Sequence, residues 1–317
     1  MIKIFYRRGA DINLARSQTE FATIGKENVL WIDLLEPTGD EKRAVEAFLG
    51  TELQTRAQAE EIESSSRFYE EDNAIFANTN FLSPAGDEMA MDPVSFILVD
   101  NILTTIREIP IRSFDTIQLK IQARPEQFVA GFNIFVEIMD KRVDLDADIV
   151  ELISKDVSQF SKRINQQEDI SEEFLLDINQ LQENAMFVRE NVVDKQRLIS
   201  NILKSKRCPM DPEIREDLGI ILQDIGSLIN HTNFAFERLE YLQDTVVGII
   251  NLDQNNIMKI FTFVSLLLMP ATLVASFYGM NVSLPFANWP WTWICIFGVM
   301  LLLIFGIWWI FRHKKML

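Results

Sequence analysis

Two long runs without charge near the C-terminal end constrain most strongly what this chain can fold into. Residues 260–278 and 291–311 contain no Asp, Glu, Lys or Arg, and aliphatic and aromatic side chains dominate both runs. Each run is close to the ~20 residues that a helix needs to cross the hydrocarbon core of a bilayer. Two core helices of a soluble protein are the alternative, but the runs are adjacent and flanked by basic and aromatic residues. We therefore predict transmembrane helices at 259–280 and 291–311, joined by an external loop at 281–290.

The basic residues beside the two spans predict their orientation. Lys259 precedes the first span, and Arg312, Lys314 and Lys315, in a basic tail at 312–317, follow the second. Because basic residues collect on the cytoplasmic side, both termini are expected in the cytoplasm, with these four residues as a basic ring near the inner mouth. The opening MIKIFYRRGADI lacks the apolar stretch of a signal peptide, so the rest of the chain is expected in the cytosol. These features predict a multi-pass protein of the cell (inner) membrane.

The charge of the chain is divided unevenly. Its formal net charge is −16. Four basic residues and no acidic residue follow Asp253, so residues 1–253 carry −20. Such an acidic surface excludes nucleic acid as a partner, because phosphate binding needs a basic face. Two Cys are too few for a disulfide framework. With only two His and no GxxxxGK[ST] loop, the chain is expected to be no enzyme and to bind no nucleotide.

Residues 1–122 have the pattern of a mixed α+β cytosolic domain. Runs rich in β-branched and aromatic residues predict strands at 2–6, 29–34, 74–81, 94–99 and 102–107. The last two flank Asp100 and Asn101, a plausible hairpin turn. Thr38 and Glu41 have the spacing of a capping box and predict a short helix that ends near Leu49.

Residues 123–258 have the pattern of a helical stalk. Apolar residues at three- and four-residue steps predict helices at 125–164 and 169–204, the second opened by a capping box of Asp169 and Glu172. Asp211 as N-cap and Pro212 at the first helical position open a third helix. No breaker interrupts it before residue 278, so one continuous helix is expected to enter the membrane. The spacing is typical of a coiled-coil-like stalk, and a packed bundle remains the alternative.

One face of this long helix is small, polar or Met-bearing, whereas its other faces are aliphatic and aromatic. Such a face indicates either helix packing or the wall of a pore, and the spacing leaves both interpretations open. Two spans cannot enclose an aqueous path, so a pore would require a homo-oligomer. The face comprises Asp244, Gly248, Asn251, Asn255, Met258, Phe261, Ser265, Met269, Thr272 and Ser276.

The first span ends in Tyr278, Gly279, Met280 and Asn281. With this GMN tripeptide at the outer end of the first of two C-terminal spans, the sequence resembles the CorA family of magnesium transporters. The resemblance covers nearly the whole chain and is strongest at 244–281. It extends through residues 255–259, Met269-Pro270 and the basic tail, with weaker similarity at 31–37, 62–67 and 103–107.

The resemblance implies a funnel-shaped homopentamer in the lipid bilayer, with Mg²⁺ as both the transported and the regulatory ion and Co²⁺ or Ni²⁺ as further substrates. It implies that Gly279, Met280 and Asn281 form the outer mouth, and that Met258 and Phe261 form an apolar constriction. Transport would then be driven by the membrane potential. Cytosolic Mg²⁺ would close the pore by bridging carboxylates between subunits, for which Asp217, Asp224 and Asp253 are candidates.

The external loop departs from the family pattern, because residues 282–290 contain no acidic residue. A cation at the mouth then lacks a local attractive charge, which predicts a weaker apparent affinity or a different ion preference. Two alternatives therefore stay open. One is a ZntB-like relative that prefers Zn²⁺, and the other is a membrane-anchored coiled-coil sensor that conducts nothing.

Overall fold

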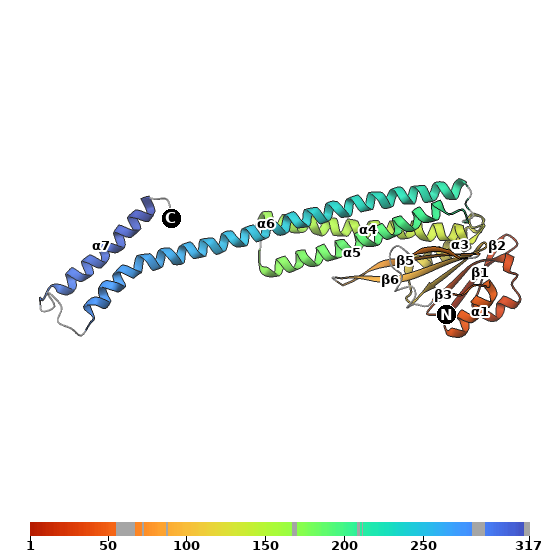
Figure 1. The fold of residues 1–317 in the computed structure, drawn as a ribbon, viewed down its shortest axis with the longest axis horizontal. Coiled ribbons are helices and arrows are strands. Elements are labelled where there is room, and N and C mark those ends of the chain that lie inside the picture. The colour runs from red at the N-terminus through yellow and green to blue at the C-terminus, as the bar shows by residue number, and fades with distance from the viewer. Residues whose placement is uncertain are drawn as a thin grey trace. The chain divides into compact units, whose positions relative to one another are not determined.

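The computed structural model describes residues 1–54, 67–71, 73–86, 88–166, 170–207, 210, 212–280 and 289–313 (Figure 1). The chain divides into two compact units, Met1–Gln243 and Asp244–Leu317. The first unit holds a sheet and the helices packed on it. The second holds the two apolar helical segments.

The first unit is built on a seven-stranded sheet with the order β2-β1-β3-β7-β6-β5-β4, in which only the β3–β7 pair is parallel. The five strands expected from the sequence are all present. The sequence did not predict β2 and β4, the two short edge strands. The strands are β1 (Ile2–Arg8), β2 (Asp11–Ala15), β3 (Val29–Leu35), β4 (Phe68–Glu71), β5 (Ala74–Ala85), β6 (Glu88–Val99) and β7 (Ile102–Arg107).

Two local signals in the sequence are confirmed. β6 and β7 form an antiparallel hairpin around Asp100, whose φ of 54° is left-handed, a conformation that Asp tolerates better than most residues. Helix α1 (Gly39–Leu49) opens with the expected capping box of Thr38 and Glu41 and stops at Gly50, which is also left-handed.

The sheet is covered on both faces (Figure 1). Alternate strand residues such as Ile4, Ile32 and Leu34 form one apolar cluster with Val45 and Leu49 of α1. The other face carries buried aromatic side chains and lies under helices α3 (Arg112–Ala123), α4 (Gly131–Gln166) and α5 (Glu172–Lys204). This α+β arrangement is the fold class that the sequence predicts.

The first long helix differs from its prediction. The helix expected at 125–164 is α4, which begins only at Gly131, because a short 3₁₀ turn spans Pro125–Gln127. The sequence did not predict α3, which ends just before this turn at Ala123. The break follows from Pro125, because proline disfavours helical geometry in the residue before it, and Arg124 has φ −138° and ψ 63°.

The other two long helices agree with the sequence in extent. Ser171 caps α5 by accepting a hydrogen bond from the Phe174 N–H, whereas the expected cap, Asp169, lies outside the described residues. Helix α6 (Pro212–Tyr278) is a single helix of 67 residues, and its expected cap, Asp211, also lies outside the described residues. Helix α7 (Thr292–His313) follows.

A buried cluster of charged groups joins α4 to α5. Arg142 donates to Asp146 at 2.8 Å through Nε, and Lys195 Nζ lies 2.9 Å from the other Asp146 oxygen. Asn191 accepts from Lys195 and donates to the backbone carbonyl of Asn80 in β5 at 2.8 Å, so the cluster also reaches the sheet. Complete burial lowers the pKa of Lys195 to about 8, although Asp146 opposes the shift.

We predict that the burial of Lys195 makes the stability of the protein depend on pH. The folded protein releases the Lys195 proton near pH 8, whereas the unfolded chain holds it to about pH 10.5, so between these values the unfolded state binds more protons and stability rises with pH. In Lys195→Met this contribution is absent. The melting temperature, followed from pH 8 to 10, should therefore increase more with pH in the wild type than in the variant, and equal slopes would contradict the assignment.

Gly131 lies where α4 meets the sheet. Its N–H donates to the carbonyl of Asn101 at 2.7 Å. A Cβ atom at this position would lie 2.3 Å from the Leu103 nitrogen and 2.6 Å from the Leu30 oxygen, both of which are backbone atoms. Glycine is therefore required here because the backbones approach so closely.

We predict that Gly131→Ala destabilises the first unit by about 1–3 kcal/mol or more, as overpacking does in a well-packed core. Gly219→Ala is a matched control, because a Cβ atom added to Gly219 in α6 would have no atom within 4 Å, and alanine favours helix. The melting temperature of the purified full-length variants should fall for Gly131→Ala and stay level or rise for Gly219→Ala.

Candidate functional site

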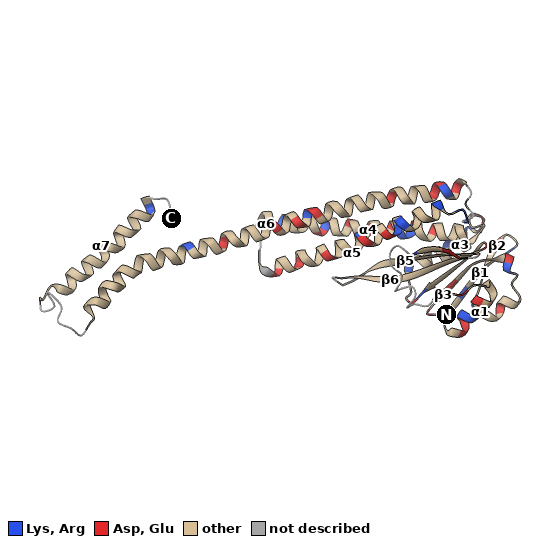
Figure 2. Ribbon diagram, viewed as in Figure 1, with Lys and Arg blue, Asp and Glu red and all other residues tan. Residues whose placement is uncertain are grey.

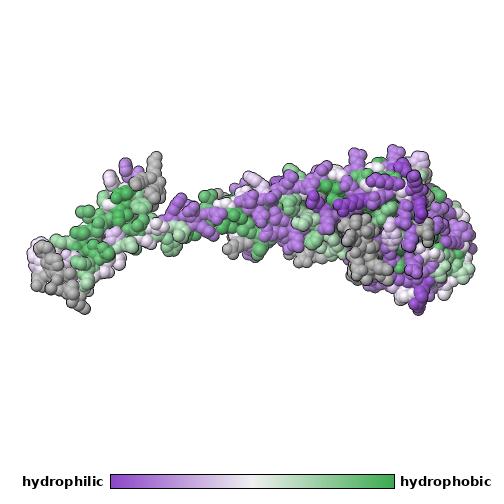
Figure 3. Space-filling view, in the orientation of Figure 1, coloured by the Kyte–Doolittle hydropathy of each residue, from purple (hydrophilic) through white to green (hydrophobic). Residues whose placement is uncertain are grey.

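Among the residues that the structure describes, two helices are long and apolar enough to cross a membrane, α6 and α7. Charged residues crowd α3 to α5 and the first part of α6 but are sparse on the end of α6 and on α7 (Figure 2). The same end of α6 and α7 present a hydrophobic surface (Figure 3). Within the second unit this surface belongs to a pair of helices that run side by side in opposite directions (Figure 1).

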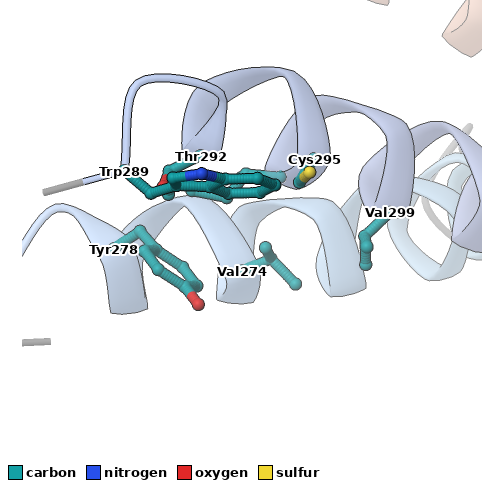
Figure 4. Close-up of a pocket in the computed structure, with 7 residues that line it drawn as sticks. Val274, Tyr278, Trp289, Thr292, Cys295 and Val299 are labelled. Atoms are coloured by element: carbon teal, nitrogen blue, oxygen red, sulfur yellow. The ribbon is translucent and has the colours of Figure 1, made fainter. Parts of the chain in front are cut away.

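Helix α7 packs against one face of α6. The rings of Phe263 and Phe311 meet edge to face, with centroids 5.4 Å apart. At the other end of the pair, Val274 and Tyr278 of α6 line a cavity of about 430 Å³ with Trp289 and residues of α7, and the Trp289 ring lies across the gap between the helices (Figure 4). Ala271, between these contacts, is buried.

The stripe of small, polar and Met-bearing residues occupies a different face. At 3.6 residues per turn, positions 258–276 of the stripe lie on roughly the opposite side of α6 from Phe263, Ala271 and Val274. All ten stripe residues, from Asp244 to Ser276, are exposed in the single chain. The packing of α7 therefore leaves the whole stripe uncovered, so the polar face is not explained by packing within one copy.

The side chains of the stripe are chemically mixed. The Thr272 hydroxyl donates to the carbonyl of Leu268 at 3.0 Å, so this side chain satisfies a helix carbonyl inside the apolar segment. Met258, Phe261 and Met269 are 63–70% exposed, which is unusual for large apolar side chains unless lipid or another copy surrounds them. Pro270 stands inside the helix and removes one backbone donor.

The C-terminal end of α6, where the GMN tripeptide begins, is described only in part. The helix ends at Tyr278, and the Gly279 N–H donates to the Ala275 carbonyl at 2.9 Å. Gly279 is not among the glycines with a left-handed backbone; a Cβ there would lie 3.2 Å from the Ala275 oxygen, so space is tight. Met280 is exposed, and Asn281 lies outside the described residues.

The end of the α6–α7 pair near Phe263 and Phe311 carries the expected charged and amide groups. Asn251, Asn255 and Lys259 are exposed on α6. The Arg312 guanidinium lies over the Trp308 ring at 5.2 Å, a cation–π contact at the end of α7. Lys314 and Lys315 lie outside the described residues.

The three carboxylates suggested for regulation, Asp217, Asp224 and Asp253, are exposed on α6. Within the described ranges, no group of three or more His, Cys, Asp or Glu is arranged to hold a metal ion. Asp140 on α4 is a further carboxylate, which was not predicted from the sequence. Burial, followed by the charges of Asp144, Glu137 and Asp224, raises the pKa of Asp140. The sequence signal that could have identified Asp140 is the recurrence of acidic residues at three- and four-residue steps along α4.

The sequence profile of the CorA-like Mg²⁺ transporter protein family matches residues 26–313. The chain belongs to this family. A magnesium transport protein CorA from Wolinella succinogenes is 35% identical over 300 residues, covering 92% of both chains. The CorA of Escherichia coli is 34% identical over 268 residues, covering 83% of this chain and 84% of its own.

The complete structure of the CorA magnesium transporter from Methanocaldococcus jannaschii has the same fold. It superposes with a TM-score of 0.79 and 18% sequence identity, covering 98% of this chain and 97% of the other. The CorA resemblance expected from the sequence and its fold class are thereby confirmed.

Whether water reaches the exposed stripe can be tested by labelling cysteine variants with a water-soluble thiol reagent. In a background without Cys208 and Cys295, Ser265→Cys lies on the stripe, whereas Leu302→Cys is a matched control that is also exposed but lies on the apolar surface of α7. We predict labelling of Ser265→Cys by a membrane-impermeant methanethiosulfonate and none of Leu302→Cys, because the reagent needs water at the thiol. Protection of both thiols would show that the stripe faces lipid or a dry interface.

Proposed function

We propose that the chain assembles as a homopentameric channel in the cell membrane that carries Mg²⁺ into the cytosol. The observation that carries the proposal is the polar stripe of α6, uncovered on the face opposite α7. The names of the curated relatives, which are magnesium transport proteins, support Mg²⁺ as the ion.

The need for several copies follows from the two helices of the second unit. One copy offers only one polar face, and a polar face exposed to hydrocarbon is costly. Copies arranged around an axis bring the stripes together around water and leave α7 to meet the lipid. The number five rests on the resemblance to the family.

The stripe suits an ion that keeps its water. Mg²⁺ dehydrates reluctantly. Carboxamide oxygens of Asn255 and Asn251, and of Asn281 at the mouth, accept hydrogen bonds from the ion's water molecules without replacing them. The inside-negative potential supplies the driving force, about 4.6 kcal/mol per 100 mV for a divalent ion, twice that for one elementary charge.

Met258 and Phe261 supply the gate in this proposal. Their large apolar side chains are exposed on the stripe one turn apart, so rings of them would narrow the path and allow it to close by dewetting. The residues below the membrane carry −20 in each copy, so assembly brings strongly like-charged surfaces together. Cytosolic Mg²⁺ at Asp217, Asp224 or Asp253 would relieve this repulsion and hold the closed state.

A comparison of Mg²⁺ flux through the wild type and the Asn281→Ala variant tests the proposed channel function. Purified protein is reconstituted in liposomes that hold a Mg²⁺-sensitive dye, and an inside-negative potential is imposed. We expect potential-driven Mg²⁺ entry in the wild type and a loss of about tenfold or more in the variant, which corresponds to ~1.4 kcal/mol of lost stabilisation. Asn288→Ala, a substitution of the same kind in the external loop, is the matched control and should leave entry unchanged.

The same assay separates the alternatives. Zn²⁺ entry without Mg²⁺ entry would assign the chain to a zinc-preferring importer. No flux of either ion through an intact oligomer, freed of Mg²⁺ on its cytosolic face, would leave a non-conducting sensor as the better account. Co²⁺ and Ni²⁺ added in place of Mg²⁺ would define the remaining selectivity.

A further inference from the structure

A cavity of about 610 Å³ lies in the first unit, away from the stripe of α6. Its described lining comes from the β5–β6 hairpin, α4 and α5. This volume is within the range of small-molecule sites. Its described lining shares no residue with the stripe or with Asp217, Asp224 and Asp253.

The walls of the cavity combine apolar surface with oxygen atoms. Phe160 of α4 and Leu176 of α5 contribute apolar surface, and Leu176 is 66% exposed. Asp156 of α4 and Asp177 of α5 contribute two carboxylates, and Gln180 adds a carboxamide. No Lys or Arg is among the described lining residues, so this described part of the lining has a formal charge of −2.

The two carboxylates have no cationic partner within the part of the chain that the structure describes. The contrast with a neighbour on α4 is clear, because Glu151 pairs with Lys155 at 2.7 Å. Asp156 is half-buried, and this burial raises its pKa, since the ionised form loses water without gaining a counter-charge. A cation that entered the cavity would recover this loss.

The walls also indicate what kind of cation fits. An ammonium group forms charge-assisted hydrogen bonds with carboxylates and is attracted to the face of an aromatic ring. Methylene groups gain by covering apolar side chains. A hydrated Mg²⁺ ion gains nothing from Phe160 or Leu176, because it keeps its water shell.

We propose that this cavity binds a linear alkylammonium compound, a diamine or polyamine, with ammonium groups at Asp156 and Asp177 and its methylene chain against Phe160 and Leu176. Binding at this site does not depend on ion transport. The test therefore succeeds or fails independently of the proposed channel.

Calorimetric titration of the purified full-length protein with spermidine tests the site. We expect saturable binding to the wild type, weakened at least about tenfold in the double variant Asp156→Asn/Asp177→Asn. Asp148→Asn removes one charge from an exposed position on α4 outside the cavity and should bind as the wild type does. An equal loss in Asp148→Asn, or no saturable binding to the wild type, would overturn the proposal.

Two further measurements keep the result interpretable. Leu176→Lys places a tethered ammonium at an exposed position of the cavity wall and should abolish spermidine binding without lowering the melting temperature. Full affinity in this variant would contradict the site. Mg²⁺ at matched ionic strength should compete poorly with spermidine. Displacement of spermidine by Mg²⁺ at the concentration at which spermidine binds would overturn the assignment of the cavity to an alkylammonium compound.

Discussion

The need of every peptide group for a hydrogen-bond partner governs the structure, because one helix lies partly in water and partly in the apolar interior of a membrane. In the part of α6 that belongs to the first unit, Pro212 to Gln243, water can satisfy exposed polar groups, whereas in the apolar segment every backbone group needs a partner within the protein. A single uninterrupted helix meets both conditions from Pro212 to Tyr278. What changes along it is the chemistry of its faces, from acidic and amphipathic to apolar with one polar stripe.

The sheet of the first unit relies on buried charge as well as apolar packing. Arg107 donates to both oxygens of Asp33, at 3.1 and 2.9 Å, and Thr105 links Asp33 to the Trp31 indole N–H. These groups join the parallel pair β3 and β7, where no hairpin fixes the register. A bidentate pair of this kind specifies which residues of two distant strands meet.

Much of this fold could be predicted from the sequence because its signals are local. The capping box at Thr38, the turn at Asp100 and the uninterrupted helix after Pro212 are each encoded within a few residues. The edge strand β4 was missed because none of its residues is buried, so it has no apolar alternation to detect. The burial of Lys195 was also missed, because Asp146 meets it only when α4 packs on α5.

The same distinction applies to the candidate site. The spacing of the stripe could be predicted because helical periodicity is local, but which face α7 covers could not, since it depends on distant contacts such as that of Phe263 with Phe311. The roles of the ten stripe residues and of Asn281 stay predictions. The acidic residues of α4 around Asp140 are visible in the sequence as a helical pattern. That they lie near Asp224 of α6 could not be predicted, because it depends on how the two helices pack.

The hydrogen bond from Thr272 to the Leu268 carbonyl has a consequence for anions. With its only hydroxyl hydrogen committed to the backbone, the exposed Thr272 oxygen offers lone pairs and no donor. In a ring of copies, these oxygens would orient water with its hydrogens toward the wall and its oxygens toward the axis. Water molecules in that orientation solvate a cation on the axis but not a chloride ion. A neutral side chain would therefore help the pore to distinguish cations from anions.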